Sequence, residues 1–281
     1  MEQAREVTRV RSLVTQARQQ GRLTGFVPTM GALHGGHLSL MRQARESCGL
    51  VVVSIFVNPM QFGPSEDFER YPRSSEKDAA LCEQTGVDVL YLPDAPSFYP
   101  SDFSTAVEVA GVSEGGEGAA RPGHFRGVAT AVAKLFLQVG PDRAFFGVKD
   151  LQQVAVVRRM IRDLDFPLEL VVGDTARDTD GLAFSSRNAY LSQEERNLAS
   201  GLPRALFSAR DRARRGERDP DSLESSTRAA LEAAGLSVDY VEVVDSSTMR
   251  RPPRVERGTA LSAAVRFGKT RLIDNVFLLE S

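Results

Sequence analysis

The sequence predicts an α/β protein with a doubly wound parallel sheet and a second, smaller α+β domain at its C-terminal end. Over roughly the first 170 residues, short apolar runs alternate with segments of helical spacing, the pattern of parallel strands joined by helices. Residues 50–57 are β-branched and apolar almost throughout, as in a strand buried on both faces. Near residue 175 the chain becomes polar and rich in turn residues. We therefore expect one domain over residues 1–175 and another over 176–281.

The elements of the first domain follow in chain order. Apolar residues at helical spacing predict an opening helix over residues 7–20, which Gly21 ends. The pattern at Ser75 and Asp78 resembles a capping box and begins another helix. Asp150 can cap a helix that follows it, and the glycine-rich residues 115–118 are expected to form a mobile loop. The other expected elements are a strand from near residue 26, a helix over 38–47, strands at 50–57, 87–92, 144–146 and 168–172, and helices over 75–86, 128–139 and 151–164.

The second domain is expected to begin with a polar segment over residues 179–188. Residues 192–195 then cap one long charged helix, and a second helix spans 221–234. Three strands with alternating patterns, near residues 238–244, 259–266 and 272–279, end the chain.

Composition excludes several classes of protein. The 281 residues are 42% hydrophobic, so a substantial core is available, while a net charge of -2 argues against nucleic-acid binding. The N-terminal residues lack the apolar stretch of a signal peptide, and no apolar run is long enough to cross a membrane. The two cysteines, Cys48 and Cys82, are expected to be buried, reduced thiols, which fits a cytoplasmic protein. Histidine and cysteine spacings typical of a zinc site are absent from the sequence.

A glycine-rich stretch over residues 26–37 is the most informative segment of the chain. It leads from a strand to a helix, and in a parallel sheet that loop faces the ligand crevice. Glycines let the backbone approach a phosphate, and the amides at a helix start favour an anion. His34 and His37 lie three residues apart at this helix start, where they can donate hydrogen bonds to a polyphosphate.

Three further motifs are ambiguous when each is taken alone. Asn58 and Gln61 either satisfy their own loop or hold a polar substrate, and Lys149 is either solvated or bound to phosphate. Ser185-Ser186-Arg187 is consistent with a simple turn or with a phosphate grip. Because one nucleotide site explains all these loops together, it is favoured over separate structural explanations for each.

These motifs together resemble the pantothenate synthetase (pantoate–β-alanine ligase) family. The resemblance covers residues 27–38, 55–62, 71–73, 121–128, 149, 150 and 153, 180–183, 185–188 and 266–275. It implies the His-x-Gly-His nucleotidyltransferase superfamily and a Rossmann-like first domain. It also implies ATP as co-substrate, Mg²⁺, the substrates pantoate and β-alanine, a cytoplasmic location and a homodimer. In the implied reaction, pantoate and ATP form pantoyl adenylate and pyrophosphate, and β-alanine then gives pantothenate and AMP.

The resemblance also implies roles for single residues. His37 is the implied general acid, His34 a phosphate contact, and Lys149 and Arg187 further catalytic cations. Gln61 and Gln153 are expected to hold pantoate, with Asn58 beside them and Gln61 also meeting β-alanine. Arg121 and His124 are expected to be structural or to line the site. The implied ATP-binding residues are Met30, Gly31, Ala32, Leu33, His34, Gly35, Gly36, His37, Gly147, Val148, Lys149, Asp150, Ala176, Phe184, Ser185, Ser186 and Arg187.

Four positions depart from the family pattern. Gly35 replaces an acidic residue, Val148 a glutamate, Leu151 an aromatic residue and Ala176 a branched residue. None removes an implied catalytic group, so we expect an effect on ATP affinity alone, with a looser loop at Gly35. No residue is assigned as a Mg²⁺ ligand, although Asp78 is a candidate, because the phosphates can supply most of the coordination.

Three other functions stay open at the level of sequence. A nucleotidyltransferase would leave the nucleotide on its product. Asn58, Gln61 and Gln153 argue against it, because they suit a small polar acid. An ATP-binding sensor would bind nucleotide without turnover. A tRNA-charging enzyme is disfavoured, because the sequence shows no basic anticodon-binding domain.

Overall fold

The computed structural model describes residues 1–64 and 66–279. The chain divides into two compact units, each made of separate stretches of the sequence. Unit 1 contains residues 1–109, 121–148 and 156–174, and unit 2 contains residues 110–120, 149–155 and 175–281. Within the described ranges, no helix is long and apolar enough to cross a membrane.

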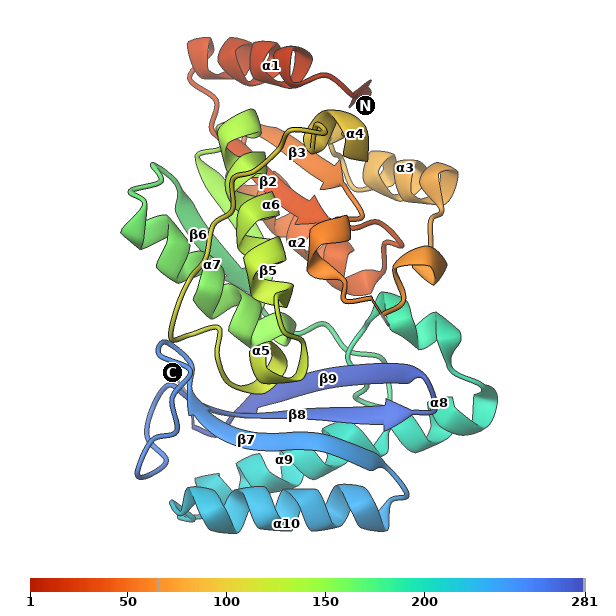
Figure 1. Cartoon of the computed structure of the whole chain (residues 1–281), viewed down its shortest axis with the longest axis vertical. Coiled ribbons are helices and arrows are strands. Elements are labelled where there is room, and N and C mark those ends of the chain that lie inside the picture. The colour runs from red at the N-terminus through yellow and green to blue at the C-terminus, as the bar shows by residue number, and fades with distance from the viewer. Residues whose placement is uncertain (65, 280–281) are drawn as a thin grey trace. The chain divides into compact units, whose positions relative to one another are not determined.

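Unit 1 is built on a six-stranded parallel sheet (Figure 1). Its strands are, in spatial order, β1 (Glu2–Ala4), β4 (Val89–Tyr91), β3 (Leu50–Ile55), β2 (Thr24–Thr29), β5 (Arg143–Gly147) and β6 (Glu169–Gly173). The chain winds outward from β2 through β3 and β4, and later from β2's other side through β5 and β6. Ligands of doubly wound sheets bind at such a switch point, outside the carboxyl ends of the strands. The predicted fold class is confirmed.

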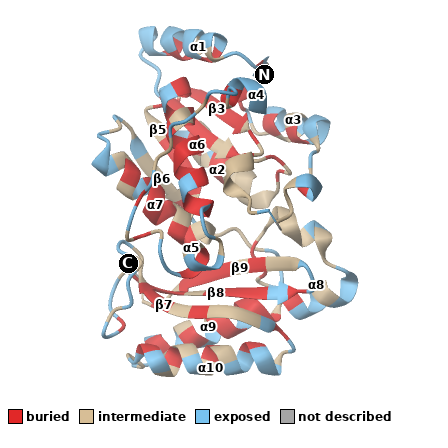
Figure 2. Ribbon diagram, in the orientation of Figure 1, coloured by how far each residue is buried: buried red, intermediate tan, exposed pale blue. Residues whose placement is uncertain are grey.

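Helices cover this sheet because its central strands are apolar on both faces. β2 and β3 are buried along almost their whole length, as Figure 2 shows. Helix α2 packs on β2, β3, β5 and β6, whereas α1 and α6 pack on β2 and on each other. The helices that lie wholly in unit 1 are α1 (Val7–Gln19), α2 (Gly35–Ser47), α3 (Ser75–Gln84), α4 (Ala95–Phe98) and α6 (His124–Val139). Helix α7 (Leu151–Asp163) begins in unit 2 and continues into unit 1.

Unit 2 contains an antiparallel sheet in the order β7-β8-β9. The strands are β7 (Ser237–Asp245), β8 (Thr259–Phe267) and β9 (Thr270–Phe277), and the helices are α5 (Gly116–Ala120), α8 (Gln193–Ala199), α9 (Gly201–Arg214) and α10 (Pro220–Ala233). Helix α9 packs on β8 and β9, and α10 packs on α9 and β7. Their apolar faces form one core, while the outer face of α10 is exposed (Figure 2).

Several predicted elements differ from the observed ones. The expected long helix after residue 192 is two helices, because Pro203 lacks the amide that would bond to the Ala199 carbonyl. The capping box predicted at its start, formed by Ser192 and Glu195, is confirmed. The predicted mobile loop over 115–118 is wrong, since helix α5 occupies residues 116–120. The predicted cap of α3 is also wrong: its N-cap is Ser74, which makes no side-chain capping bond.

Candidate active site

The loop that follows β2 has an unusual backbone that is held from within. Gly31 and Ala32 both have left-handed conformations, with φ of 81° and 50°. This conformation suits glycine and is unfavourable for alanine. Thr29 fixes the beginning of the loop, because its Oγ1 accepts a hydrogen bond from the Gly31 amide at 3.1 Å and donates one to the Ser54 carbonyl at 2.8 Å.

A buried carboxylate holds the next two residues of this loop. Asp78 lies on α3 and is 2% exposed. Its Oδ2 accepts a hydrogen bond from the Ala32 amide at 2.9 Å, and its Oδ1 accepts one from the Leu33 amide at 2.8 Å. Asp78 therefore ties the third helix of the fold to the middle of the glycine-rich loop.

His34 and His37 form a reciprocal cap at the start of α2. The Gly36 amide donates to His34 Nδ1 at 3.2 Å, and the His34 amide donates to His37 Nδ1 at 3.4 Å. The two half-buried rings lie with their centroids 4.0 Å apart. Because each Nδ1 accepts a hydrogen bond, the neutral form of each ring carries its proton on Nε2. The arrangement thus supplies two Nε2–H donors from neighbouring rings.

The backbone amides of the loop differ from the cradle that the sequence predicts. Five of them, those of Gly31, Ala32, Leu33, His34 and Gly36, already donate to side chains of unit 1. In a glycine-rich phosphate loop, by contrast, such amides point at the ligand. The imidazole Nε2–H groups are consequently the better candidates for binding an anion at this helix start.

Asn58 follows β3 and fully satisfies its side-chain amide within the protein. Its Nδ2 donates to the Gln61 Oε1 at 3.1 Å and to the Gly127 carbonyl at 3.0 Å. Its Oδ1 accepts from the Met60 amide at 3.2 Å and from the Tyr99 hydroxyl at 2.9 Å. An asparagine amide offers two donor hydrogens and two acceptor lone pairs, so all four positions are used. Asn58 therefore orients Gln61 and has no position left for a substrate.

Gln61 lies in the short helical turn η1 (Pro59–Gln61) and is held at both its side chain and its backbone. Its Nε2 lies 2.9 Å from the Met30 sulfur, and its carbonyl accepts from His124 Nδ1 at 2.9 Å and from Arg121 Nη2 at 3.3 Å. Arg121 also donates to His124 Nε2 at 3.0 Å. Since an arginine only donates, His124 accepts at Nε2 and carries its proton on Nδ1, the opposite tautomer to that of the loop histidines.

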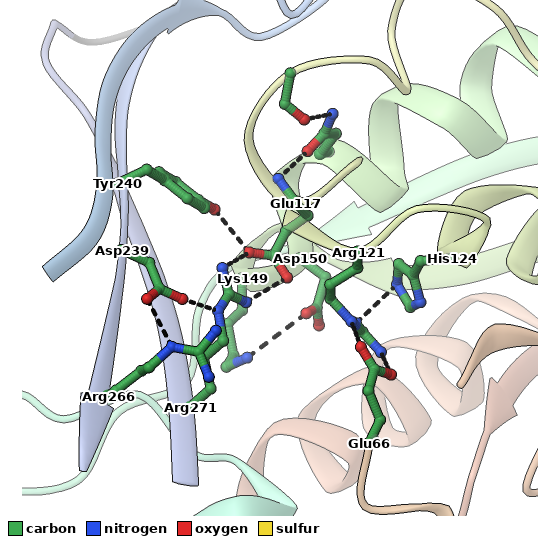
Figure 3. A network of polar contacts seen from close by, with 12 residues as sticks. Glu66, Glu117, Arg121, His124, Lys149, Asp150, Asp239, Tyr240, Arg266 and Arg271 are labelled. Atoms are coloured by element: carbon green, nitrogen blue, oxygen red, sulfur yellow. Dashed lines mark hydrogen bonds and ion pairs between the residues drawn. The ribbon is translucent and has the colours of Figure 1, made fainter. Parts of the chain in front are cut away.

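Glu66 completes this support with a bidentate ion pair to Arg121, drawn in Figure 3. The two bonds measure 2.7 and 2.6 Å, and both side chains are mostly buried. Burial by itself would raise the pKa of Glu66, but the hydrogen bonds and charge of Arg121 outweigh it and lower the pKa. Glu66, Arg121, His124 and Gln61 thus form one connected network in unit 1.

Unit 2 holds the predicted phosphate-binding lysine near its own acidic neighbour. Lys149 and Asp150 lie in the turn η3 (Val148–Asp150), with Nζ 3.6 Å from Oδ1. The Lys149 side chain is 18% exposed. Its carbonyl accepts a hydrogen bond of 2.8 Å from the Asn275 side chain on β9. The C-terminal sheet therefore fixes the backbone that carries Lys149.

A second anchor from β9 holds the segment before the Ser-Ser-Arg motif. Arg177 makes a bidentate ion pair with Asp274, with bonds of 2.6 and 3.0 Å, and donates to the carbonyls of Gly181 and Asn275. Asp274 is 1% exposed, so this is a buried pair. Removing one partner of such a pair leaves an uncompensated buried charge. The loop over residues 177–183 is therefore firmly attached to the sheet.

The Ser-Ser-Arg motif itself forms the start of a short helical turn, η4 (Ser186–Tyr190). Ser185 caps it, with its hydroxyl accepting from the Arg187 amide at 3.3 Å. The Phe184 amide donates to the Ala176 carbonyl at 3.0 Å, which brings two predicted ATP-site residues together. The turn that the sequence suggests is therefore present in unit 2, and a role of these residues in binding ATP stays a prediction.

Adjacent glutamines at the start of α7 differ in their environment. Gln152 is 5% exposed and bonds to the carbonyls of Val112 and Gly115 and to the amide of Glu117. Gln153, the residue predicted to hold pantoate, is only half-buried. Gln152 thus has a structural role, which leaves Gln153 as the glutamine of this pair suited to a ligand.

Glu117 attaches helix α5 to the C-terminal sheet through its side-chain hydrogen bonds, as Figure 3 shows. Its carboxylate accepts from Arg271 at 2.7 Å and from the Tyr240 hydroxyl at 3.0 Å. Asp239 in turn accepts from both Arg266 and Arg271 at 2.6 Å. This network explains why a glycine-rich segment forms an ordered helix here.

Comparison with known proteins identifies the family. The model of the family described as pantoate-beta-alanine ligase matches residues 2–277, almost the whole chain. The chain belongs to the pantoate–β-alanine ligase family. It is similar to a pantothenate synthetase from Chloroflexus aurantiacus, with 52% identity over 94% of this chain and 95% of that one.

Two solved structures of pantoate–β-alanine ligases resemble the chain over its length. A pantothenate synthetase from Thermus thermophilus matches with a TM-score of 0.94 and 46% identity, covering 99% of both chains. A pantoate-beta-alanine ligase from Francisella tularensis, complexed with beta-gamma ATP and beta-alanine, matches with a TM-score of 0.82 and 30% identity over 99% of this chain and 98% of that one. The predicted family and enzyme class are confirmed.

The four departures from the ligase pattern lie in different settings. Gly35 is the first residue of α2, directly after the His34 cap. Leu151 is 4% exposed and belongs to the core, while Val148 is half-buried in η3. Ala176 contributes its backbone carbonyl to the bond from Phe184. Their effect on ATP affinity stays a prediction.

Sequence reasoning missed the supporting residues of this candidate site. The sequence suggests Asp78 only as a metal ligand and a helix cap, and its bonds to the loop cross 45 and 46 residues of sequence. No local pattern singles out Glu66, Asp274 or Asn275 as site supports either. The one available signal for Asp274 and Asn275 is their place in the last motif of the family resemblance.

Proposed function

We propose that the chain joins pantoate to β-alanine, with ATP as co-substrate, and releases pantothenate, AMP and pyrophosphate. The observation that carries the proposal is the pair of imidazoles at the start of α2, which supplies two Nε2–H donors. Helix α2 follows β2, the strand at the switch point of the sheet. Membership of the pantoate–β-alanine ligase family supports the substrates. The Francisella ligase complexed with beta-gamma ATP and beta-alanine supports the use of ATP and the amine.

In the first step, a carboxylate oxygen of pantoate attacks the α-phosphorus of ATP. The bond from this phosphorus to the bridging oxygen breaks, and pyrophosphate leaves with the electron pair. The Nε2–H groups of His34 and His37 stabilise the charge that develops on the phosphate oxygens. His37 is proposed to supply a proton to the leaving group from its imidazolium form, in which Nδ1 no longer accepts from the His34 amide. Lys149 and Arg187 are proposed to neutralise the phosphates further, since both nucleophile and electrophile are anionic at the start.

In the second step, the amine of β-alanine attacks the acyl carbon of pantoyl adenylate. The C–N bond forms, the C–O bond to AMP breaks, and the amine loses a proton. Gln61 and Gln153 are proposed to hold the pantoyl group by hydrogen bonds. Asn58, which the sequence placed beside them, is proposed to act through Gln61, because its own four hydrogen-bonding positions are occupied within the protein.

Mg²⁺ is proposed to be carried mainly on the phosphates of ATP, where it would neutralise charge. Within residues 1–64 and 66–279, no group of three or more histidine, cysteine, aspartate or glutamate residues is arranged to hold a metal ion. No step above therefore depends on a protein ligand to the metal.

The remaining ATP-site assignments follow the family resemblance. We propose that residues 30–37, Gly147 to Asp150, Ala176 and residues 184–187 contact the nucleotide. A cytoplasmic location is proposed with them, and it fits two cysteines that are buried and free. The homodimer and the domain boundary at residue 175 are carried forward as proposals, and sedimentation equilibrium would test the first.

The deciding experiment measures AMP release by the purified protein. AMP formation from ATP should require both pantoate and β-alanine, and His37→Ala should slow it by about 10²–10⁴-fold, the usual contribution of a general acid. AMP formation independent of either acid or amine would contradict the proposal. Mass spectrometry of the product distinguishes the nucleotidyltransferase alternative, which keeps the nucleotide on the product, and the sensor alternative, which forms none.

A further inference from the structure

The buried carboxylate of Asp78 is bound by backbone amides of a loop that lies 45 and 46 residues away in the sequence. Its two oxygens accept from consecutive amides, Ala32 and Leu33, at 2.9 and 2.8 Å. Within residues 1–64 and 66–279, no arginine or lysine forms an ion pair with it. A charged group that is 2% exposed must be stabilised by hydrogen bonds, and here the loop amides supply them.

This attachment fixes a backbone shape that the loop would not adopt readily by itself. Ala32 has a φ of 50° directly after Gly31, whose φ is 81°. With this turn, both amides face Asp78, and Leu33 enters the core at 6% exposure. The chain then extends at His34, with φ -142°, and α2 begins.

The position of the histidine pair depends on where this turn ends. His34 follows Leu33 directly, and its amide donates to the His37 ring while its own ring caps the Gly36 amide. A change in the direction of the chain at Ala32 or Leu33 would therefore move both rings together. Small displacements of groups that stabilise a transition state reduce the rate strongly.

We propose that Asp78 is a positioning residue for adenylate formation, which holds the loop so that the Nε2–H groups of His34 and His37 face the phosphates. The catalytic part of this inference rests on the proposed function. It replaces the alternative that Asp78 is a Mg²⁺ ligand, since each of its oxygens already accepts a backbone amide in a buried position.

The test compares Asp78→Asn with a matched control, Asp88→Asn. An asparagine at 78 offers one acceptor and places an NH₂ group against the other amide. Asp88 also accepts a backbone amide, that of Val51 at 2.7 Å, and pairs with Arg45 at 2.7 Å, but at the opposite end of β3. Each variant loses one carboxylate that accepts backbone amides within unit 1. Only Asp78→Asn also loses the support of the loop that carries His34 and His37.

Adenylate formation is followed by pantoate-dependent exchange of pyrophosphate into ATP, below the melting temperature of every variant. Asp78→Asn should lower kcat/KM for ATP in this exchange by on the order of 10²-fold. In Asp78→Asn, the rate of the second step, measured from supplied pantoyl adenylate and β-alanine, should change less than threefold. Asp88→Asn should retain the wild-type rates of both steps. A wild-type exchange rate in Asp78→Asn, or an equal loss in Asp88→Asn, would overturn the proposal.

A magnesium titration separates positioning from metal binding. The Mg²⁺ concentration for half-maximal exchange should be the same in Asp78→Asn and in the wild type. Recovery of the rate at high Mg²⁺ would make Asp78 a metal ligand and would contradict the inference.

Hydrogen exchange supplies a readout that needs no activity, and its measurement on the wild type needs no folded variant. In the wild type, the amides of Ala32 and Leu33 should exchange slowly, and in a folded Asp78→Asn they should exchange at least tenfold faster, a loss that Asp88→Asn should not share. Rapid exchange of both amides in the wild type would refute the attachment itself. An inactive wild type with protected amides would instead refute the proposed function and leave the attachment standing.

Discussion

Replacing Asn58 by alanine tests whether this buried amide orients Gln61, which is proposed to hold pantoate. The substitution removes four hydrogen bonds of a residue that is 2% exposed. At about 0.5–1.5 kcal/mol for each of the four bonds, the expected loss of unfolding free energy is about 2–6 kcal/mol. For a chain of this size, at about 2–4 °C for each kcal/mol, that corresponds to a melting temperature lower by about 4–24 °C.

The same substitution should weaken the binding of pantoate. Gln61 Oε1 loses the 3.1 Å bond from Asn58, so its amide is free to turn. One neutral hydrogen bond is worth about 1 kcal/mol, which converts to about a fivefold rise in KM for pantoate. The KM for ATP should change less than twofold. Steady-state kinetics with each substrate varied in turn measures this difference.

Tyr99→Phe is the matched control for this prediction. It removes the 2.9 Å bond to Asn58 Oδ1 and leaves the bond between Asn58 and Gln61 in place. It should lower the melting temperature by about 2–4 °C, the effect of about 1 kcal/mol, with no change in KM for pantoate. If Asn58→Ala lost stability and yet kept the wild-type KM for pantoate, the orienting role of Asn58 would be refuted.

Two further predictions concern the supports of the same loop. The pKa of Glu66 is lowered in the folded protein, because the hydrogen bonds from Arg121 outweigh burial; its contribution to stability is therefore complete above about pH 5 and is lost as pH falls through the lowered pKa. Glu66→Gln should lower the melting temperature at pH 7 and flatten its fall below about pH 5, and a slope equal to that of the wild type would contradict this. Gly127→Ala would place a Cβ 2.2 Å from the Met60 carbonyl oxygen, so it should cost about 3 kcal/mol or more. Gly63→Ala should cost less than about 1 kcal/mol, because among the described residues beyond its chain neighbours its Cβ would first meet Glu66 Cγ, at 3.7 Å. Thermal unfolding of the two alanine variants side by side measures the difference.

Local patterns in the sequence were sufficient to predict the parallel sheet. The apolar run that predicts a strand over residues 50–57 folds as β3, which ends at Ile55. A buried strand of a parallel sheet is apolar on both faces, and this signal does not depend on distant residues. By contrast, β1 has only three residues, of which Glu2 and Gln3 are polar, so it carries no such signal.

Elements that depend on distant contacts were not predictable in this way. Residues 115–118 are rich in glycine and favour a loop, yet α5 forms there because Gln152 and Arg271 bind it from 35 and 154 residues away. The pattern at Ser75 and Asp78 predicts a cap for α3, but the carboxylate bonds to the loop after β2 instead. In both cases a tertiary contact replaces the local interaction that the sequence suggests.

The loop after β2 shows how the right function can be inferred from an incomplete mechanism. The sequence suggested that glycine amides bind the phosphates, whereas Asp78 and the histidine rings already occupy several of these amides. These internal bonds hold the backbone of the loop, and we propose that the Nε2–H groups therefore take the role of donor to the phosphates. We propose that the imidazolium of His37 assists loss of pyrophosphate as a general acid, a role that a backbone amide cannot take. The internal bonds of the loop are therefore consistent with an enzyme that cleaves the triphosphate rather than a protein that only binds it.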